Sequence, residues 1–276
     1  MGIKKHIPNA LTCCNLLCGC MAIIASGDPL SALIFVLLAA FFDFFDGLSA
    51  RSLKAYSSIG KDLDSLADMV SFGVLPAIVG VRYQMYPITV GPSPSDLDSS
   101  VWLPEFFLAI VSFVLPLLIA VFSALRLAKF NNDKRQTENF IGLATPACAI
   151  LYVSLIAVLR AAVDLPYGQP VSESSWSLMA NGKVLWHWCY WIPVVIAPVL
   201  CWLLVSEIPM FSMKFKNLSW PDNRDRYIFL MIVAVEIIMA IVGRFSFPAL
   251  LVAVITTYII INLLMLAFRK KPKLKE

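Results

Sequence analysis

Four of the five aspartates between residues 43 and 68, namely Asp43, Asp46, Asp64 and Asp68, are the side chains most able to do chemistry. Asp43 and Asp46 are three residues apart and Asp64 and Asp68 are four apart, so on helices each pair shares one face. Carboxylates within otherwise apolar sequence are costly in lipid and therefore indicate a functional site. Their hard oxygen atoms suit Mg²⁺ or Mn²⁺ and not zinc. The segment therefore predicts a divalent-metal site that binds phosphate at a membrane surface.

The same segment places small residues and a cation at regular positions. From Asp43 to Asp68 it fits D-x2-D-G-x2-A-R-x8-G-x3-D-x3-D at all eight positions. This pattern resembles the signature of the CDP-alcohol phosphatidyltransferase family. Five further fragments resemble the phosphatidylserine synthase branch, namely 7–19, 64–73, 124–131, 142–146 and 207–212. The resemblance covers residues about 7 to 216 and departs at Lys129, where the branch usually has Arg.

The resemblance implies that CDP-diacylglycerol donates its phosphatidyl group to the hydroxyl of L-serine and that CMP leaves. It implies that two divalent ions, Mg²⁺ or Mn²⁺, are held by Asp43, Asp46, Asp64 and Asp68. Asp68 is expected to act as the general base, because a protonated serine hydroxyl is a poor nucleophile. CDP is expected to lie against Gly47, Ala50, Arg51 and Gly60. A homodimer formed through membrane helices is also expected.

An amino-acid acceptor brings a carboxylate, so its site should contain a cation that sites for neutral alcohols lack. Arg126, at the inner end of the fourth apolar segment, is the candidate for that carboxylate. Lys129 and Asn131 are expected to help order the loop that follows. Alternatively, Arg126 and Lys129 bind lipid phosphate or simply follow the bias of basic residues toward the cytoplasm. The residues leave both interpretations open.

Polar side chains recur at the inner end of the first apolar segment. Asn9, Thr12 and Asn15 are spaced by three residues and would face the bundle. Asn9 and Thr12 either contact the nucleotide or satisfy a helix end and neighbouring helices. Both interpretations stay open.

The composition predicts an integral membrane protein with an all-α, polytopic bundle. The chain is 59% hydrophobic and 14% charged, with a mean hydropathy of +0.79. About eight spans are expected, near 9–26, 30–50, 63–82, 104–126, 144–163, 186–206, 227–243 and 246–268. Residues 1–216 would form a catalytic core of six spans. Residues 217–276 would add a transmembrane hairpin with a basic cytoplasmic tail.

The basic residues predict the orientation. Placing both termini in the cytoplasm leaves only Arg82, Arg160, Lys183 and Arg244 on the outer side. The aspartates then lie at the cytoplasmic ends of the second and third spans, so the active site would face the cytoplasm from the cytoplasmic (inner) membrane. The net charge of +4 reflects these span ends and does not indicate a nucleic-acid partner.

There are two alternative functions: the same reaction with another acceptor, and cation transport. The same chemistry with glycerol 3-phosphate or an inositol phosphate would need further cations, which Lys134 and Arg135 could supply. A cation transporter would place carboxylates near the bilayer midplane on broken helices. The aspartates instead adjoin Arg51 and Lys54 at a predicted cytoplasmic edge. The expected partners are therefore CDP-diacylglycerol, L-serine and membrane lipids.

Overall fold

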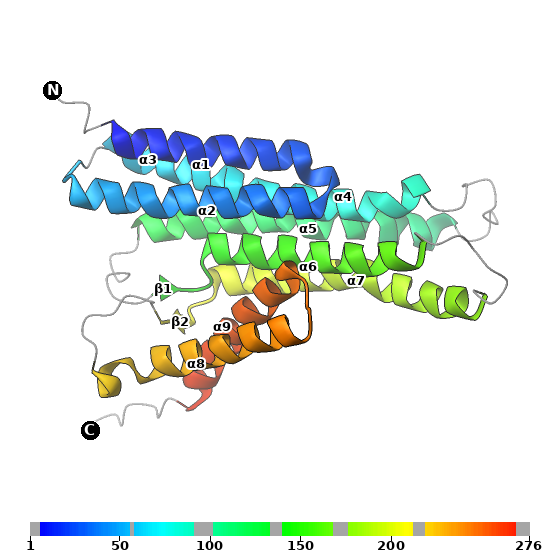
Figure 1. The fold of residues 1–276 in the computed structure, drawn as a ribbon. Helices are drawn as coiled ribbons and strands as arrows, with labels where there is room; N and C mark the ends of the chain where they lie inside the picture. The colour runs from blue at the N-terminus through cyan, green and yellow to red at the C-terminus, as the bar shows by residue number, and fades with distance from the viewer. Residues whose placement is uncertain are drawn as a thin grey trace, which may run out of the picture.

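The computed structural model describes residues 6–55, 58–90, 102–132, 140–167, 176–211 and 219–268. Within these ranges the chain is a bundle of long helices (Figure 1). The elements are α1 (Ile7–Ile24), the 3-10 turn η2 (Ala25–Gly27), α2 (Pro29–Ser52), α3 (Ser58–Asp68), the π-helical turn η3 (Met69–Val74), α4 (Leu75–Val90), α5 (Trp102–Asn132), β1 (Phe140–Ile141), α6 (Thr145–Tyr167), α7 (Trp176–Val205), β2 (Pro209–Met210), α8 (Trp220–Val242) and α9 (Phe247–Phe268).

Seven helical segments in the described ranges are long and apolar enough to cross a membrane. They are Ile7–Gly27, Pro29–Ser52, Ile59–Met85, Phe107–Asn132, Thr145–Val163, Trp188–Val205 and Phe247–Ala267. The predicted all-α membrane bundle is therefore confirmed. Helix α8 is not among these segments; it carries Asp225, Arg226 and Glu236. A span formed by α8 stays a prediction.

Asp28 sets the turn that folds α2 back along α1. Its carboxylate accepts hydrogen bonds from the backbone amides of Leu30 (3.3 Å) and Ser31 (3.0 Å) and from the Ser31 hydroxyl (2.5 Å). This is an N-cap, and Pro29 suits the first turn that follows. The Ser31 hydroxyl hydrogen bond lowers the pKa of the Asp28 carboxyl below its usual range. The resulting antiparallel pair brings the start of α1 beside the end of α2 (Figure 1).

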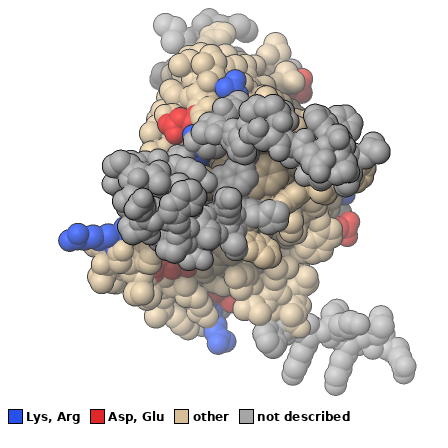
Figure 2. Space-filling model, turned by 90° about the vertical axis from the view of Figure 1, so that its right-hand side faces the viewer, with Lys and Arg blue, Asp and Glu red and all other residues tan. Residues whose placement is uncertain are grey.

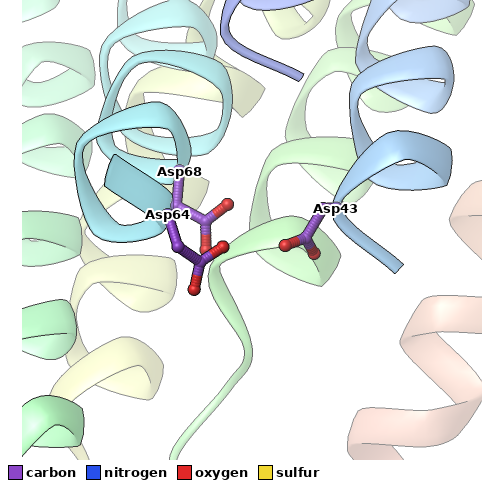
Figure 3. Close-up of side chains that lie close together, drawn as sticks. All are labelled: Asp43, Asp64 and Asp68. Carbon is purple, nitrogen blue, oxygen red and sulfur yellow. The ribbon is translucent and has the colours of Figure 1, made fainter. Parts of the chain in front are cut away.

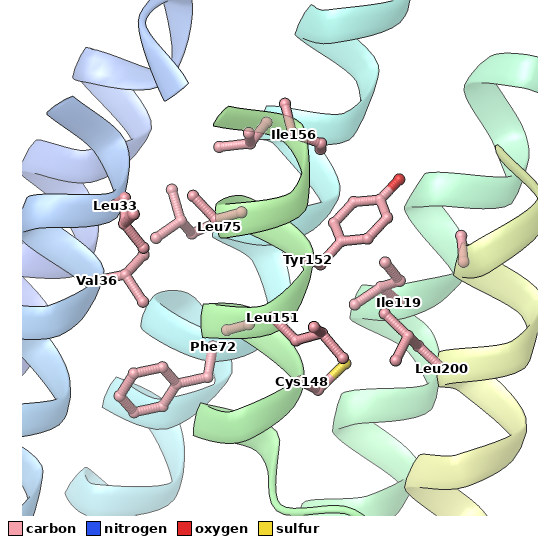
Figure 4. Close-up of a cluster of buried hydrophobic side chains, with 14 of the residues drawn as sticks. Leu33, Val36, Phe72, Leu75, Ile119, Cys148, Leu151, Tyr152, Ile156 and Leu200 are labelled. Carbon is pink, nitrogen blue, oxygen red and sulfur yellow. The ribbon is translucent and has the colours of Figure 1, made fainter. Parts of the chain in front are cut away.

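The core lies around α6, which passes between α2 and α4 on one side and α5 and α7 on the other (Figure 4). Tyr152 of α6 is fully buried, and its hydroxyl donates to the Pro193 carbonyl of α7 at 3.2 Å. A Cβ atom on Gly80 would come within 2.8 Å of that hydroxyl. Helices in lipid associate largely through such close packing of small residues. The helices are therefore held together by a core that does not include the aspartates.

The helix of the third predicted span changes geometry directly after Asp68. The π-helical turn η3 follows, and such turns often accompany functional sites. The hydroxyl of Ser71 in this turn donates to the backbone carbonyl of Asn15 in α1 at 3.1 Å. Gly19, one turn further along α1, lies so close to Ser71 that a Cβ atom there would collide with the serine hydroxyl. Helix α1 is thus locked against the segment that carries Asp68.

A small antiparallel sheet joins the segments before α6 and after α7. Phe140 pairs with Met210 and Ile141 with Pro209. Gly142, which follows β1, has φ +74°, and a Cβ atom there would lie 2.8 Å from the Leu204 carbonyl, so the position requires glycine. The fragments 142–146 and 207–212, which resembled the synthase branch, therefore meet in space at this sheet.

Helix α9 packs against α6 and is also tied to this sheet. The Tyr258 hydroxyl donates to the Phe211 carbonyl at 2.9 Å, and the Phe211 amide donates to Asn262 Oδ1 at 2.9 Å. Helices α8 and α9 form a helical hairpin beside the core (Figure 1), and the predicted basic tail after α9 lies outside the described residues. Both side chains of α9 thus complete the hydrogen bonding of one backbone residue next to β2.

Candidate metal and substrate site

Three of the four aspartates converge between α2 and α3 (Figure 3). Asp64 and Asp68 lie one turn apart on α3 and point toward Asp43 on α2. One carboxylate oxygen from each residue lies within 4.8 Å of the other two. Each carboxylate is only partly exposed. Three like charges at this separation repel one another and are stable together when a cation lies between them.

The donor set fits a hard divalent cation. It consists of carboxylate oxygens alone, the ligand type that Mg²⁺ and Mn²⁺ prefer. Oδ1 of Asp64 is buried and accepts no hydrogen bond from the residues that the structure describes. A buried carboxylate oxygen without a partner is costly, and coordination to a metal would remove that cost. Asp43, Asp64 and Asp68 are therefore the residues best placed to hold the ion.

Asp46 occupies a different position from the other three aspartates. It is 5% exposed, and its Oδ2 accepts a hydrogen bond from the Thr12 hydroxyl at 2.6 Å. It is close enough to repel Asp43 and Asp64 electrostatically, but it lies outside the cluster whose oxygens are within 4.8 Å of one another. Asp46 is thus adjacent to the three-carboxylate cluster and held from α1.

Helix α1 contacts both halves of the acidic motif. Thr12 binds Asp46, and the Asn15 side-chain amide donates to Asp68 Oδ1 at 3.2 Å. The two α1 side chains are buried and three residues apart, so they share a face. The spacing predicted that they face the bundle, but it did not identify Asn15 as a partner of Asp68. Asn9 lies near Thr12 and lines a cleft beside Asp46 and Asp64.

A cleft of about 200 Å³ opens beside Asp46 and Asp64. It is lined by ten residues from α1, α2, α3 and the connection between them: Pro8, Asn9, Thr12, Asp46, Gly47, Ala50, Ala55, Gly60, Lys61 and Asp64. A Cβ atom on Gly47 would meet nothing within 4 Å, so the space beside this residue is open. Three of the four positions expected to contact CDP, Gly47, Ala50 and Gly60, therefore line one cleft.

The cation in the cleft is Lys61, which the motif did not single out. Its Nζ donates to the Asn131 carbonyl at 3.3 Å. Arg51, the expected CDP-binding cation, is exposed in the last turn of α2 and is not among the cleft-lining residues. Lys61 directly follows Gly60 of the motif, but only the folded arrangement shows that its side chain reaches the cleft.

Arg126 of α5 is buried close to Asp68. It is 7% exposed and interacts electrostatically with that carboxylate. Its Cζ lies 5.8 Å from the Phe130 ring centroid, and its Nε donates to no group in the part of the chain that the structure describes. Lys129 is exposed. Asn131 ties α5 to α3, because its side-chain amide donates to the Ser65 hydroxyl at 2.8 Å.

The fold and the site together define a polytopic helical membrane protein with an acidic centre suited to divalent cations. Residues 5–199 match the family model of the CDP-alcohol phosphatidyltransferases, and the chain belongs to that family. Members generally use divalent metal ions, in agreement with the cluster of Asp43, Asp64 and Asp68.

Several curated relatives share the name CDP-diacylglycerol–serine O-phosphatidyltransferase. The Bacillus subtilis protein is 32% identical over 153 residues, which cover 55% of this chain and 75% of the relative. The Mycobacterium leprae protein is 31% identical over 216 residues, 75% of this chain, and the chain spans only 58% of that relative. The Methanocaldococcus jannaschii protein is 27% identical over 256 residues, 93% of each chain.

Proposed function

We propose that the protein transfers the phosphatidyl group of CDP-diacylglycerol to the hydroxyl of L-serine, giving phosphatidylserine and CMP. The observation that carries the proposal is the convergence of Asp43, Asp64 and Asp68 beside a cleft lined by the small residues of the motif. Relatives of this chain carry the name of that activity. The position of the site at one end of the bundle, where α2 ends and α3 begins, favours an enzyme over a transporter (Figure 1).

Divalent ions, two of Mg²⁺ or Mn²⁺, would be held by Asp43, Asp64 and Asp68, with Asp46 as the fourth ligand. Thr12 holds Oδ2 of Asp46 beside the three-carboxylate cluster. When bound, the ions neutralise charge on the pyrophosphate of the donor and on the departing CMP. Thr12 would orient the Asp46 carboxylate, as partners of metal ligands commonly do.

Asp68 would act as the general base. It takes the proton of the serine hydroxyl, and the hydroxyl oxygen forms a bond to the phosphorus that carries diacylglycerol. The bond from that phosphorus to the CMP oxygen breaks, and CMP leaves with the electron pair. Asp68 suits this role because it lies in the cluster, is partly exposed, and is oriented by the Asn15 amide. Such base assistance contributes about 10²–10⁴-fold to the rate.

The CDP part of the donor would lie in the cleft of about 200 Å³. Gly47, Ala50 and Gly60 leave room for the nucleotide, and Lys61 supplies positive charge for its phosphates. Arg51, exposed at the end of α2, would contact a phosphate at the rim or anionic lipid nearby.

Arg126 is our candidate for the serine carboxylate. Arg126 is buried and interacts with Asp68, and its Nε has no hydrogen-bond partner among the described residues; both features suit a carboxylate ligand. Lys129 and Asn131 would order the end of α5, and Asn131 does so through Ser65. Lys134 and Arg135, which an acceptor with its own phosphate would favour, lie outside the described residues.

The site would face the cytoplasm from the inner membrane. Asp28, Arg82 and Arg160 lie together at the opposite end of the bundle, where Gly27 is near Arg82 and Asp28 interacts with Arg160. Viewed from that end, the described surface carries few, scattered charges (Figure 2). In the sequence, the predicted outer side holds only Arg82, Arg160, Lys183 and Arg244, which supports this orientation. The homodimer stays a prediction.

The test is CMP release from CDP-diacylglycerol by the purified protein in detergent micelles with Mg²⁺ or Mn²⁺. L-Serine, glycerol 3-phosphate and inositol phosphate are compared as acceptors. We expect release that depends on L-serine and stops with EDTA. Release with another acceptor alone would retain the metal site and reassign the substrate. Absence of release with all three acceptors would contradict the proposed reaction class.

A further inference from the structure

Two buried polar atoms beside Asp68 lack partners among the described residues. They are Oδ1 of Asn15, a hydrogen-bond acceptor, and Nε of Arg126, a cationic donor. Asn15 is 0% exposed and Arg126 is 7% exposed, so bulk water does not compensate either group. Buried polar groups are normally paired, and an orphaned acceptor and donor around one carboxylate indicate a ligand that carries both complements.

The orientation of the Asn15 amide follows from its partner. An ionised carboxylate only accepts hydrogen bonds, so the Asn15 NH₂ group faces Asp68 Oδ1 at 3.2 Å. The amide oxygen is therefore the atom left without a donor. The Ser71 hydroxyl donates to the Asn15 backbone carbonyl, and α1 lies so close to η3 that a Cβ atom on Gly19 would collide with Ser71. Oδ1 is thus an acceptor held in one place next to the catalytic carboxylate.

Arg126 approaches Asp68 from another helix. Asn15 lies on α1 and Arg126 on α5, and both helices pack against η3, the turn that follows Asp68. Asp68 therefore has a neutral acceptor from α1 and a cationic donor from α5 as neighbours. An α-amino acid with a side-chain hydroxyl matches this arrangement, because it carries an ammonium donor, a carboxylate acceptor and the reacting proton.

We propose that Asn15 is a specificity-determining residue whose Oδ1 accepts a hydrogen bond from the α-ammonium group of the acceptor. Arg126 binds the α-carboxylate of the same molecule, and Asp68 receives the hydroxyl proton. The inference rests on the proposed function and deepens it, since it states why an amino acid is chosen over other alcohols. An acceptor without an ammonium group leaves Oδ1 unpaired and is disfavoured.

The experiment compares L-serine with 3-hydroxypropionate, which keeps the hydroxyl and carboxylate but lacks the ammonium group. The readout is the ratio of kcat/KM for L-serine to that for 3-hydroxypropionate, or the ratio of inhibition constants where turnover is too slow. Any loss caused by displacement of Asp68 affects both acceptors and cancels in this ratio. In Asn15→Ala we expect the ratio to fall about 10- to 100-fold, the effect of a hydrogen bond to a charged group.

Three controls sharpen the result. Asn15→Asp keeps an oxygen acceptor and should retain the preference for L-serine. Ser71→Ala removes one contact to the Asn15 backbone but leaves the Asn15 amide, so its ratio should fall much less than that of Asn15→Ala. Arg126→Gln should instead reduce the preference for L-serine over ethanolamine, which lacks the carboxylate.

An unchanged ratio in folded Asn15→Ala would overturn the proposal and leave Asn15 with only its contact to Asp68. Folding is checked by retained binding of CDP-diacylglycerol. If Asn15→Ala does not fold, the Asn15→Asp and Asn15→Leu ratios decide, with loss expected for Asn15→Leu alone, because leucine has no acceptor. Failure of the wild type to use L-serine at all would be a failure of the proposed function, which the wild-type assay reports separately.

Discussion

The Thr12 hydroxyl donates to Asp46 Oδ2 over 2.6 Å, joining the first helix to the acidic motif of the second. Both residues are buried and both line the cleft. The contact therefore ties the geometry of a proposed metal ligand to a residue outside the motif.

Thr12→Val removes this donor and keeps the shape of the side chain. We expect the concentration of Mg²⁺ or Mn²⁺ that gives half-maximal CMP release to rise about 10- to 100-fold, because partners orient metal ligands. Thr12→Ser retains the hydroxyl and should behave as the wild type. Equal metal dependence in Thr12→Val and wild type would show that Asp46 needs no such orientation.

Asp68→Asn removes the proposed base but keeps the size of the side chain. At saturating Mg²⁺ or Mn²⁺, turnover should fall by at least about 10²–10⁴-fold. CDP-diacylglycerol binding should fall much less, because Asp43 and Asp64 still hold the ions and the cleft does not include Asp68. Single-turnover CMP release and equilibrium binding of the CDP-lipid separate the two effects. Unchanged turnover would remove Asp68 as the base.

Metal removal should stop the reaction without dismantling the fold, since the core around α6 is separate from the aspartates. We expect EDTA to abolish CMP release and added Mg²⁺ or Mn²⁺ to restore it. Asp43→Asn should raise the metal requirement about 10-fold or more, because it removes a charged ligand. Asp62→Asn is the matched control, as Asp62 is an exposed aspartate of α3 outside the cluster. An identical shift in both variants would argue for a general charge effect.

Lys61→Gln and Arg51→Gln distinguish the two cations near the motif. Lys61 lines the cleft, whereas Arg51 is exposed outside it. Lys61→Gln should raise the KM for CDP-diacylglycerol about 10-fold or more, because hydrogen bonds to charged groups contribute about 1.5–3 kcal/mol. Arg51→Gln should have the smaller effect. The reverse order would place the phosphates at the end of α2.

The Asp28 cap predicts a pH-dependent contribution to stability. Its pKa is lowered in the folded protein, chiefly by the Ser31 hydroxyl. The stabilisation is therefore complete above about pH 4, the ordinary pKa of the group, and is lost as the pH falls through the lower folded-state value. Asp28→Ala should cost about 0.5–1 kcal/mol at pH 7, the lower part of the range for caps, since Asp28 is exposed.

Thermal unfolding in detergent at pH 7 and pH 3 measures this contribution. The difference between wild type and Asp28→Ala should shrink at the lower pH. Asp28→Asn keeps a capping side chain without a titrating group, so its stability relative to Asp28→Ala should not depend on pH. A constant difference between wild type and Asp28→Ala would exclude a role for the carboxylate charge.

Local spacing was enough to predict the helices and which acidic side chains share a helix face, while the roles of these aspartates as metal ligands stay predictions. Asp64 and Asp68 share a face by helical geometry alone, and the structure brings Asp43 to them as expected. The partners Asn15 and Lys61 were not assigned, since their contacts depend on how α1 and α5 pack against α3.

The π-helical turn after Asp68 and the β1–β2 pairing were also not predicted. A π turn is rare, and the paired strands are two residues long, so neither gives a periodic signal. The predicted span at 227–243 does give a clear signal, but that signal is not enough to assign a membrane span. Its apolar run is clear, but Glu236 within it, whose Oε1 accepts from Thr257 at 2.5 Å, weakens any assignment from composition.

The hydrogen bonds from α9 to Phe211 bear on the order in which the chain matures. Tyr258 and Asn262 satisfy both backbone groups of a residue that precedes them by more than forty positions. Unpaired backbone groups are poorly tolerated in lipid. During synthesis, the amide and carbonyl of Phe211 therefore lack these partners until α9 has emerged from the ribosome. The backbone of Phe211, next to the small sheet, is fully hydrogen-bonded only after α9 has been made.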